Sequence, residues 1–225
     1  GKGDERVAAH AMRSGADDYL VKEDLNPATV AVALEHVLER FRNDQKRAQH
    51  EAELVRMARF DELTGLYNRR YLLDRLTEET LRARRYGSDL CILMMDVDHF
   101  KRINDTYGHL MGDKVLASIA EILNSTIRAT DLAGRYGGEE FCILLTETNV
   151  KGGHNVAERL RKRIAMRNFS PSEGDIFHVT CSIGLAQFDR RISDQHAFLD
   201  LADRALYNAK NSGRDRVVLA ATVAI

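Results

Sequence analysis

The strongest constraint on the fold is a regular alternation of helical and strand-like apolar patterns that begins after Phe60. Leu90–Val97 is an apolar run of strand length, and Gly137-Gly138 separates two further apolar runs, as the turn of a hairpin does. The periodicity predicts helices over residues 68–86, 114–127, 150–166 and 197–210, and strands over 90–97, 132–136, 141–145, 177–188 and 216–219. This order predicts an α+β fold, in which helices flank a mostly antiparallel central sheet.

The segment before this alternation predicts one long helix over residues 27–60, and therefore an N-terminal helical stalk. Pro27 suits the first turn of a helix. A thin apolar stripe follows it, formed by Val30, Leu34, Val37 and Phe41. Because this stripe has no partner within its own helix, residues 27–56 are interpreted as a stalk or a dimer coil. Packing of the helix against the following domain is the alternative.

The charges of the 225 residues nearly balance, with 33 basic and 34 acidic side chains and a formal net charge of −1. A protein that binds nucleic acid by bulk electrostatics needs a basic surplus, so we expect no nucleic-acid partner. No apolar run approaches the roughly 20 residues of a membrane span, and the charged opening of the sequence lacks the pattern of a signal peptide. We therefore expect a cytoplasmic protein with no membrane partner.

Asp96 is the first candidate for chemistry, because it ends a strand that is otherwise apolar. A carboxylate there is costly unless water, a partner or a metal ion compensates its charge. Exposure to solvent or capping of the next turn is the alternative. Asp98 would share the face of Asp96 if the strand continued, so one of the two could be a ligand and the other a local cap.

Two more carboxylates, Glu139 and Glu140, follow the glycine turn. Neighbouring strand residues point to opposite faces, so only one of this pair can readily join Asp96. Two carboxylates that converge from adjacent strands make an oxygen site of the kind that Mg²⁺ accepts together with waters and phosphates. The pattern therefore indicates phosphoryl transfer.

The segment RYGGEEF at residues 135–141 resembles the signature of the GGDEF family of diguanylate cyclases, in its GGEEF form. Further family motifs follow in the expected order: DELTGLYNR at 61–69, DVDHFK at 96–101, NDTYGH at 104–109, GD at 112–113, SIG at 182–184, AD at 202–203, YNAK at 207–210 and GR at 213–214. The resemblance implies a GGDEF domain over residues 57–222 with a fold similar to the palm of nucleotide cyclases. The implied reaction joins two GTP molecules into cyclic di-GMP and releases two pyrophosphates.

The resemblance also implies two Mg²⁺ ions per active site, or Mn²⁺ in their place, held by Asp96, the carbonyl of Val97 and Glu139. Glu139 would accept the proton of the 3′-hydroxyl group, and Glu140 would assist at the metals. Backbone N–H groups of the turn Val97–Lys101 would bind the phosphates. The other implied substrate-binding residues outside the base pocket are His99, Phe100, Lys101, Gly137, Gly138, Lys210 and Arg214.

Asn104 and Asp113 correspond to the family's guanine-reading residues, with Asp113 accepting hydrogen bonds from N1–H and N2–H of the base. Two of the implied roles have local alternatives. Asp113 could be the N-cap of a helix after Gly112. Lys210 could simply suit the last turn of a helix, where the macrodipole favours a cation.

Arg128-Ala129-Thr130-Asp131 resembles the family's RxxD inhibitory site, where bound product holds two domains apart. The same pattern occurs at residues 102–105 and 191–194, so its position shortly before Gly137 carries the resemblance. Arg159 corresponds to a second arginine that can bind the same ligand from the partner domain. Guanidinium groups suit this role because they pair with phosphate and stack on guanine.

The segment Gly15–Lys22 resembles, more weakly, the last strand of a response-regulator receiver domain, with Lys22 in the place of the lysine that contacts the phosphoryl group. Glu23 stands where a proline commonly follows that lysine. Residues 1–26 are therefore interpreted as the C-terminal remnant of a receiver that cannot be phosphorylated. An unrelated loop and strand is the alternative.

Two other functions are alternatives to the cyclase. A catalytically silent GGDEF domain could serve as a cyclic di-GMP receptor through the RxxD site, but its usual mark is an eroded signature, and this signature is intact. A cyclase for other purines is disfavoured because Asp113 is the residue type that selects guanine. Since each domain would hold one GTP and the product contains two phosphodiester bonds, the expected active species is a symmetric homodimer.

Overall fold

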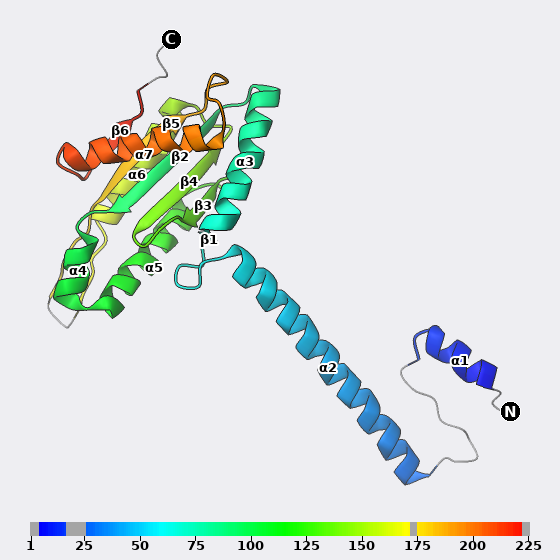
Figure 1. Cartoon of the computed structure of the whole chain (residues 1–225). Helices are drawn as coiled ribbons and strands as arrows, with labels where there is room; N and C mark the ends of the chain where they lie inside the picture. Colours follow the sequence, from blue (N-terminus) through cyan, green and yellow to red (C-terminus); the bar gives the residue numbers. More distant parts are fainter. Residues whose placement is uncertain (1–4, 17–25, 172–174, 222–225) are drawn as a thin grey trace. The chain divides into compact units, whose positions relative to one another are not determined.

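The computed structural model of the chain describes residues 5–16, 26–171 and 175–221 (Figure 1). The chain forms two compact units, Gly1–Arg56 and Met57–Ile225. Among the described residues, no helix is both long enough and apolar enough to cross a membrane.

The N-terminal unit contains two helices, α1 (Glu5–Arg13) and most of α2 (Pro27–Arg59). The long helix predicted from residue 27 is confirmed, and Asn26 caps it by accepting hydrogen bonds from the N–H groups of Ala28 and Thr29. Most of the apolar stripe of α2 is exposed, with Leu34 and Phe41 at 58% and 60% of their full accessibility, whereas Val37 is half-buried. Helix α1 was not predicted, and the receiver-like strand over residues 15–22 falls mostly on residues outside the described ranges.

The second unit is built on a six-stranded sheet in the order β1-β3-β4-β2-β5-β6. The three central pairings, β3 with β4, β4 with β2 and β2 with β5, are antiparallel, whereas the outer strands β1 and β6 pair in parallel. The predicted mostly antiparallel sheet is therefore confirmed. The strands are β1 (Tyr67–Asn68), β2 (Leu90–Val97), β3 (Leu132–Arg135), β4 (Glu140–Thr146), β5 (Cys181–Gln187) and β6 (Val217–Leu219).

Helices cover both faces of this sheet, which explains why every residue of the central strand β2 is buried. Leu93 and Met95 point into one apolar cluster together with residues of α5 and α6. Ile92 and Met94 point into the other cluster, which residues of α3 and α7 complete. The helices of this unit are α3 (Arg69–Tyr86), α4 (Phe100–Tyr107), α5 (His109–Thr126), α6 (Val150–Ala165) and α7 (Gln195–Asn211).

The structure corrects the sequence analysis in the segment after β2. Residues 100–107 form a separate short helix, α4, which was not predicted, and α5 begins at His109 rather than at residue 114. Gly108, with a φ of 81°, separates the two helices and is the N-cap of α5. The N-cap interpretation of Asp113 is therefore wrong, because Asp113 lies within α5. The predicted strand over 177–188 is also shorter, since β5 begins at Cys181.

Candidate active site

Asp96 lies at the carboxyl end of β2, where its Cα is opposite Glu140 of β4 and Ser182 of β5. The residue is only 6% exposed, and its Oδ2 atom forms an ion pair with Lys210 Nζ at 2.7 Å. Burial raises the pKa of the Asp96 carboxyl group, whereas the hydrogen bond and the positive charge of Lys210 lower it. The predicted strand-end carboxylate is therefore buried and paired, and the solvent-exposed alternative is wrong.

Glu139 is the glutamate whose charge is coupled to Asp96. It lies in the hairpin turn before β4, and its backbone carbonyl accepts a hydrogen bond from Val97 N at 3.2 Å. Burial raises the pKa of Glu139, and the negative charges of Asp96 and then Glu140 raise it further, while Lys210 opposes the shift. Asp96, Glu139 and Lys210 therefore share one electrostatic site at this edge of the sheet.

The glycine turn itself is a tight hairpin, as predicted. The N–H groups of Tyr136 and Gly137 both donate to the carbonyl of Glu140, at 2.8 and 3.2 Å. Gly138 is exposed at the tip of the turn. This geometry holds Glu139 beside the end of β2.

Helix α7 brings Lys210 to the site because it packs directly on β5. A Cβ atom added to Gly184 of β5 would overlap the backbone of Ala202 and Leu206, so only glycine permits this close approach. Lys210 lies in the last turn of α7, where the helix dipole also favours a cation. The dipole interpretation of Lys210 and its pairing with Asp96 are thus compatible.

The donor set suits a hard divalent cation. Among the described residues, no three His, Cys, Asp or Glu side chains form a ready metal cluster. Asp96 and Glu139 nevertheless offer two carboxylates. The negative charge of Asp96 raises the pKa of Glu139, and a bound cation would relieve this repulsion. Mg²⁺ commonly takes one or two carboxylates and completes its shell with water and substrate phosphates. The residues present therefore fit such an ion, while the carbonyl of Val97 stays a predicted ligand.

Asn104 and Asp113 lie on α4 and α5, on either side of Gly108. The Asn104 Oδ1 atom is buried and has no hydrogen-bond partner within the described part of the chain. A Cβ atom on Gly112 would overlap this oxygen, so the glycine makes room for the Asn104 amide. Asp113, one residue further along α5, is exposed. A buried acceptor without a donor is uncommon and suggests that a ligand supplies the missing hydrogen bond.

The remaining predicted substrate residues border the same end of the sheet. His99 has a φ of 57° and is the N-cap of α4, Phe100 is buried, and Lys101 is exposed in the first turn of that helix. Arg214 follows α7 and is exposed, and its positive charge lowers the pKa of Asp96.

The predicted inhibitory residues lie at the other end of the strands. Asp131 accepts hydrogen bonds from the backbone N–H groups of Arg128 and Thr146, and Thr146 is paired with Leu90, the first residue of β2. Asp96 lies six residues further along β2, about 20 Å away at 3.3 Å per residue. Arg159 of α6 donates to the carbonyl of Thr126 at the end of α5. The buried Asp131 carboxylate thus holds the turn, which leaves the exposed Arg128 as the stronger ligand candidate.

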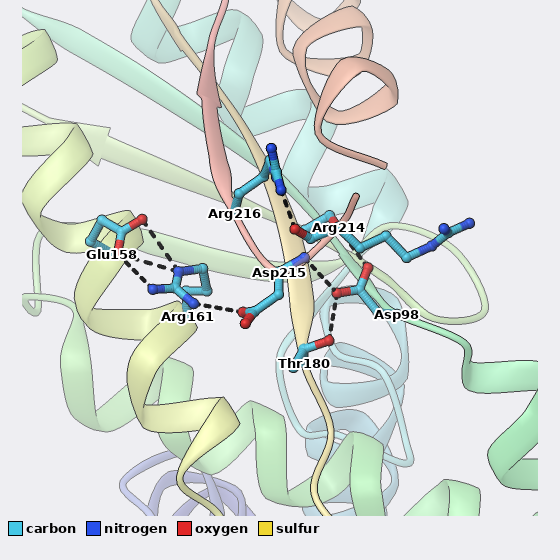
Figure 2. Close-up of polar contacts among 8 residues, drawn as sticks. Asp98, Glu158, Arg161, Thr180, Arg214, Asp215 and Arg216 are labelled. Carbon is cyan, nitrogen blue, oxygen red and sulfur yellow. Dashed lines mark hydrogen bonds and ion pairs between the residues drawn. The ribbon is translucent and has the colours of Figure 1, made fainter. Parts of the chain in front are cut away.

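The structure gives roles to two residues that the sequence did not predict. No role was predicted for Arg135, and Asp98 was predicted to be a ligand or a local cap. Arg135 donates to the carbonyl of Gly138 at 2.7 Å and forms an ion pair with Asp61, so it braces the hairpin turn. Asp98 is neither a local cap nor exposed. Its carboxylate accepts hydrogen bonds from Thr180 and from the backbone of Asp215 (Figure 2). It also accepts one from the hydroxyl group of Ser182. Only the tertiary fold brings these partners together, although the position of Asp98 beside Asp96 marked it for attention.

Comparison with known proteins identifies the class of domain that carries this site. A family model described as "Diguanylate cyclase, GGDEF domain" matches residues 58–216. The chain belongs to the GGDEF family.

The chain is similar to diguanylate cyclase DgcP of Pseudomonas aeruginosa, with 38% identity over 215 residues that cover 94% of this chain and 32% of the relative. It is also similar to the response regulator PleD of Caulobacter vibrioides, with 35% identity over 209 residues that cover 92% of this chain and 46% of PleD. The chain thus spans about a third to a half of the length of these curated relatives.

Solved structures show the same fold. The coiled coil and GGDEF domain of DgcB from Caulobacter crescentus, in complex with c-di-GMP, matches 84% of this chain and all of that chain, with 30% identity and a TM-score of 0.74. The active GGEEF domain of a diguanylate cyclase from Vibrio cholerae matches 70% of this chain and 99% of that chain, with 34% identity and a TM-score of 0.67. These matches confirm the predicted fold class.

Proposed function

We propose that this chain is a diguanylate cyclase that joins two GTP molecules into cyclic di-GMP and releases two pyrophosphates. The observation that carries this proposal is the convergence of Asp96, Glu139 and Lys210 at one end of a GGDEF-family sheet. The named relatives DgcP and the Vibrio cholerae protein are diguanylate cyclases, which supports the same activity here.

Asp96, Glu139 and the carbonyl of Val97 would hold two Mg²⁺ ions, or Mn²⁺, which would neutralise phosphate charge during the transfer. Glu139 would accept the proton of the attacking 3′-hydroxyl group, because its raised pKa brings it closer to the working pH than an ordinary glutamate. Glu140 would assist at this site. Lys210 and Arg214 would bind the phosphates, together with the backbone of the turn at residues 97–101 and of the glycine pair.

The base would lie against α4 and α5. Asn104 Oδ1 offers a buried acceptor to the guanine, and Asp113 would accept from its N1–H and N2–H groups. Adenine presents a different donor pattern and would leave these acceptors unpaired, which would favour GTP over ATP.

Regulation and assembly extend the proposal. Cyclic di-GMP would bind at Arg128 and Asp131 of one domain and Arg159 of its partner, and it would inhibit the enzyme. The DgcB domain binds c-di-GMP, which supports binding of this product here. Two copies of the chain would face each other for catalysis.

The silent-receptor alternative is weaker because both carboxylates and Lys210 of the catalytic site are present. A cytoplasmic location stays a prediction.

The test is a turnover assay. Purified protein is incubated with GTP and Mg²⁺, and the nucleotides are separated by chromatography. We expect cyclic di-GMP and pyrophosphate to form in a ratio of one to two. If the protein binds cyclic di-GMP but forms none at any protein concentration, the receptor function replaces the cyclase.

A further inference from the structure

The turn after α7 has an unusual backbone that needs support. Arg214 and Asp215 both have left-handed conformations, with φ values of 59° and 43°, and they follow Gly213, whose φ is 107°. Non-glycine residues pay an energetic cost in this region, so two in succession persist only where surrounding contacts determine the turn. This turn connects α7, which carries Lys210, to strand β6.

Asp98 supplies the inner support. Its side chain is 4% exposed and accepts three hydrogen bonds: from Thr180 Oγ1 at 2.7 Å, from Ser182 Oγ at 2.7 Å, and from the backbone N–H of Asp215 at 3.1 Å. The carboxylate thus joins the end of β2 to β5 and to the turn (Figure 2). Three protein donors occupy three of the about four acceptor sites of the Asp98 carboxylate, whereas Asp96 is paired with Lys210.

The side chain of Asp215 supplies the outer support. Its Oδ1 accepts a hydrogen bond from Arg161 Nη1 at 2.6 Å, and Arg161 of α6 is also paired with Glu158. Arg216 Nε donates to the carbonyl of Arg214 at 2.9 Å. In Figure 2 the Arg214 side chain extends past Asp98, on the side away from Arg161 and Glu158. The turn is therefore held on two sides while Arg214 stays free to reach a ligand.

We propose that Asp98 and Asp215 are positioning residues, which fix the turn after α7 so that Arg214 and Lys210 face the phosphates of GTP. The inference rests on the proposed function, because it assigns the phosphates to this edge of the sheet. It predicts that Asp98 contributes to triphosphate binding only through the turn, and not as a metal ligand or as a contact to the base.

The experiment compares two probes. One is GMP, and the other is a thiophosphate analogue of GTP that does not react. Both are titrated by calorimetry in the presence of Mg²⁺. The Asp98→Asn substitution removes the charge and places an amide group beside Asp215 N. We expect it to weaken binding of the GTP analogue by about tenfold, the usual effect of losing one charge-assisted hydrogen bond, and to change GMP binding less than twofold. Arg214→Ala should show the same selectivity, and the losses should be less than additive in the double variant, because Asp98 acts partly through Arg214.

Two further variants keep the test independent of folding. Asp215→Ala alters a side chain that is 42% exposed, and we expect it to weaken GTP-analogue binding selectively even if Asp98→Asn folds poorly. Asp194→Ala removes the N-cap at the other end of α7 and should lower the melting temperature without changing the ratio of the two affinities.

Equal losses of GTP-analogue and GMP binding in Asp98→Asn and Asp215→Ala, or additive losses in the double variant, would overturn the positioning role. The positioning role is also overturned if the native protein, Asp98→Asn and Asp215→Ala bind the GTP analogue equally well. If the native protein itself does not bind the analogue, the proposed function fails and this inference fails with it.

Discussion

Lys210 Nζ lies 2.7 Å from Asp96 Oδ2, which joins the last turn of α7 to the carboxyl end of β2. The pair combines a buried carboxylate with a partly exposed lysine, so the lysine can turn to a phosphate while a cation takes its place beside Asp96. The site therefore presents both charges that a nucleotide with its metal ions requires.

Replacing either metal-site carboxylate should abolish turnover and leave the fold intact. We expect Asp96→Asn and Glu139→Gln to lower the rate of cyclic di-GMP formation by about a thousandfold or more, because each loses a ligand that stabilises the transition state. Initial rates and circular dichroism spectra of both variants provide the measurement. Near-native activity in either one would show that the metal site is assigned wrongly.

The Asp96 carboxylate should lower the stability of the folded protein when no metal ion is bound. Folding raises the pKa of Asp96 above its ordinary value of 3.8. At pH values just above 3.8 the folded chain therefore binds more protons than the unfolded chain, and its stability falls as the pH rises through this range. In EDTA at pH 7, Asp96→Asn should therefore raise the melting temperature of the GGDEF domain by about 2–4 °C. The gain should disappear below pH 3.8.

Asp189 provides the control for this prediction, because pairing with Arg191 lowers its pKa to about 2. Asp189→Asn should not raise the melting temperature at pH 7. Added Mg²⁺ should stabilise the native protein and leave Asp96→Asn unchanged. A pH-independent gain in Asp96→Asn would contradict the electrostatic explanation.

Guanine selection should depend on the space that Gly112 leaves for Asn104. Gly112→Ala places a methyl group where the Asn104 amide oxygen lies, so we expect it to weaken GTP binding about as much as Asn104→Ala does, by roughly tenfold for one lost hydrogen bond. Gly152→Ala, in the first turn of α6, is the matched control and should bind GTP normally. Competition with ATP measures selectivity, and comparable turnover of ATP and GTP by the native protein would refute the assignment.

Much of the fold could be predicted from local pattern. The strand over residues 90–97 and the hairpin around Gly137 were placed correctly, because apolar runs and glycine turns report directly on burial and chain reversal. The break at Gly108 was missed, since α4 is only eight residues long and buries only Phe100 and Ile103, which is too short a pattern to mark a separate helix. This miss led to the wrong N-cap interpretation of Asp113.

Single residues of the candidate site could be predicted from the sequence, but the contacts between residues far apart in the chain could not. The position of Asp96 at the end of an apolar strand predicted a carboxylate whose charge needs compensation, and Lys210 provides it. The roles of Asp98 and Arg135 depend on partners far away in the chain, Asp215 and Asp61, and no local pattern reveals such pairs. The buried, unpaired oxygen of Asn104 likewise becomes visible only when α4 and α5 are packed together.

Specific activity should rise with protein concentration, because the proposed reaction needs two GTP molecules held by two facing domains. The exposed stripe of α2 is the evident segment for joining two copies, but the polar stretch from Arg42 to Glu53 interrupts it. Initial rates and sedimentation over a dilution series provide the measurement. Constant specific activity at concentrations where the protein is shown to be monomeric would contradict the dimer mechanism.

Product inhibition should be relieved by Arg128→Ala and should not compete with GTP, because Arg128 lies at the opposite end of the strands from Asp96. Arg128→Ala removes an exposed guanidinium group and leaves the backbone hydrogen bond to Asp131 in place, so the turn should survive. Asp131→Ala should also relieve inhibition, but it should lower stability, since it removes the acceptor of two backbone N–H groups. Initial rates with and without added cyclic di-GMP test both variants, and unchanged inhibition in Arg128→Ala would show that the product acts elsewhere.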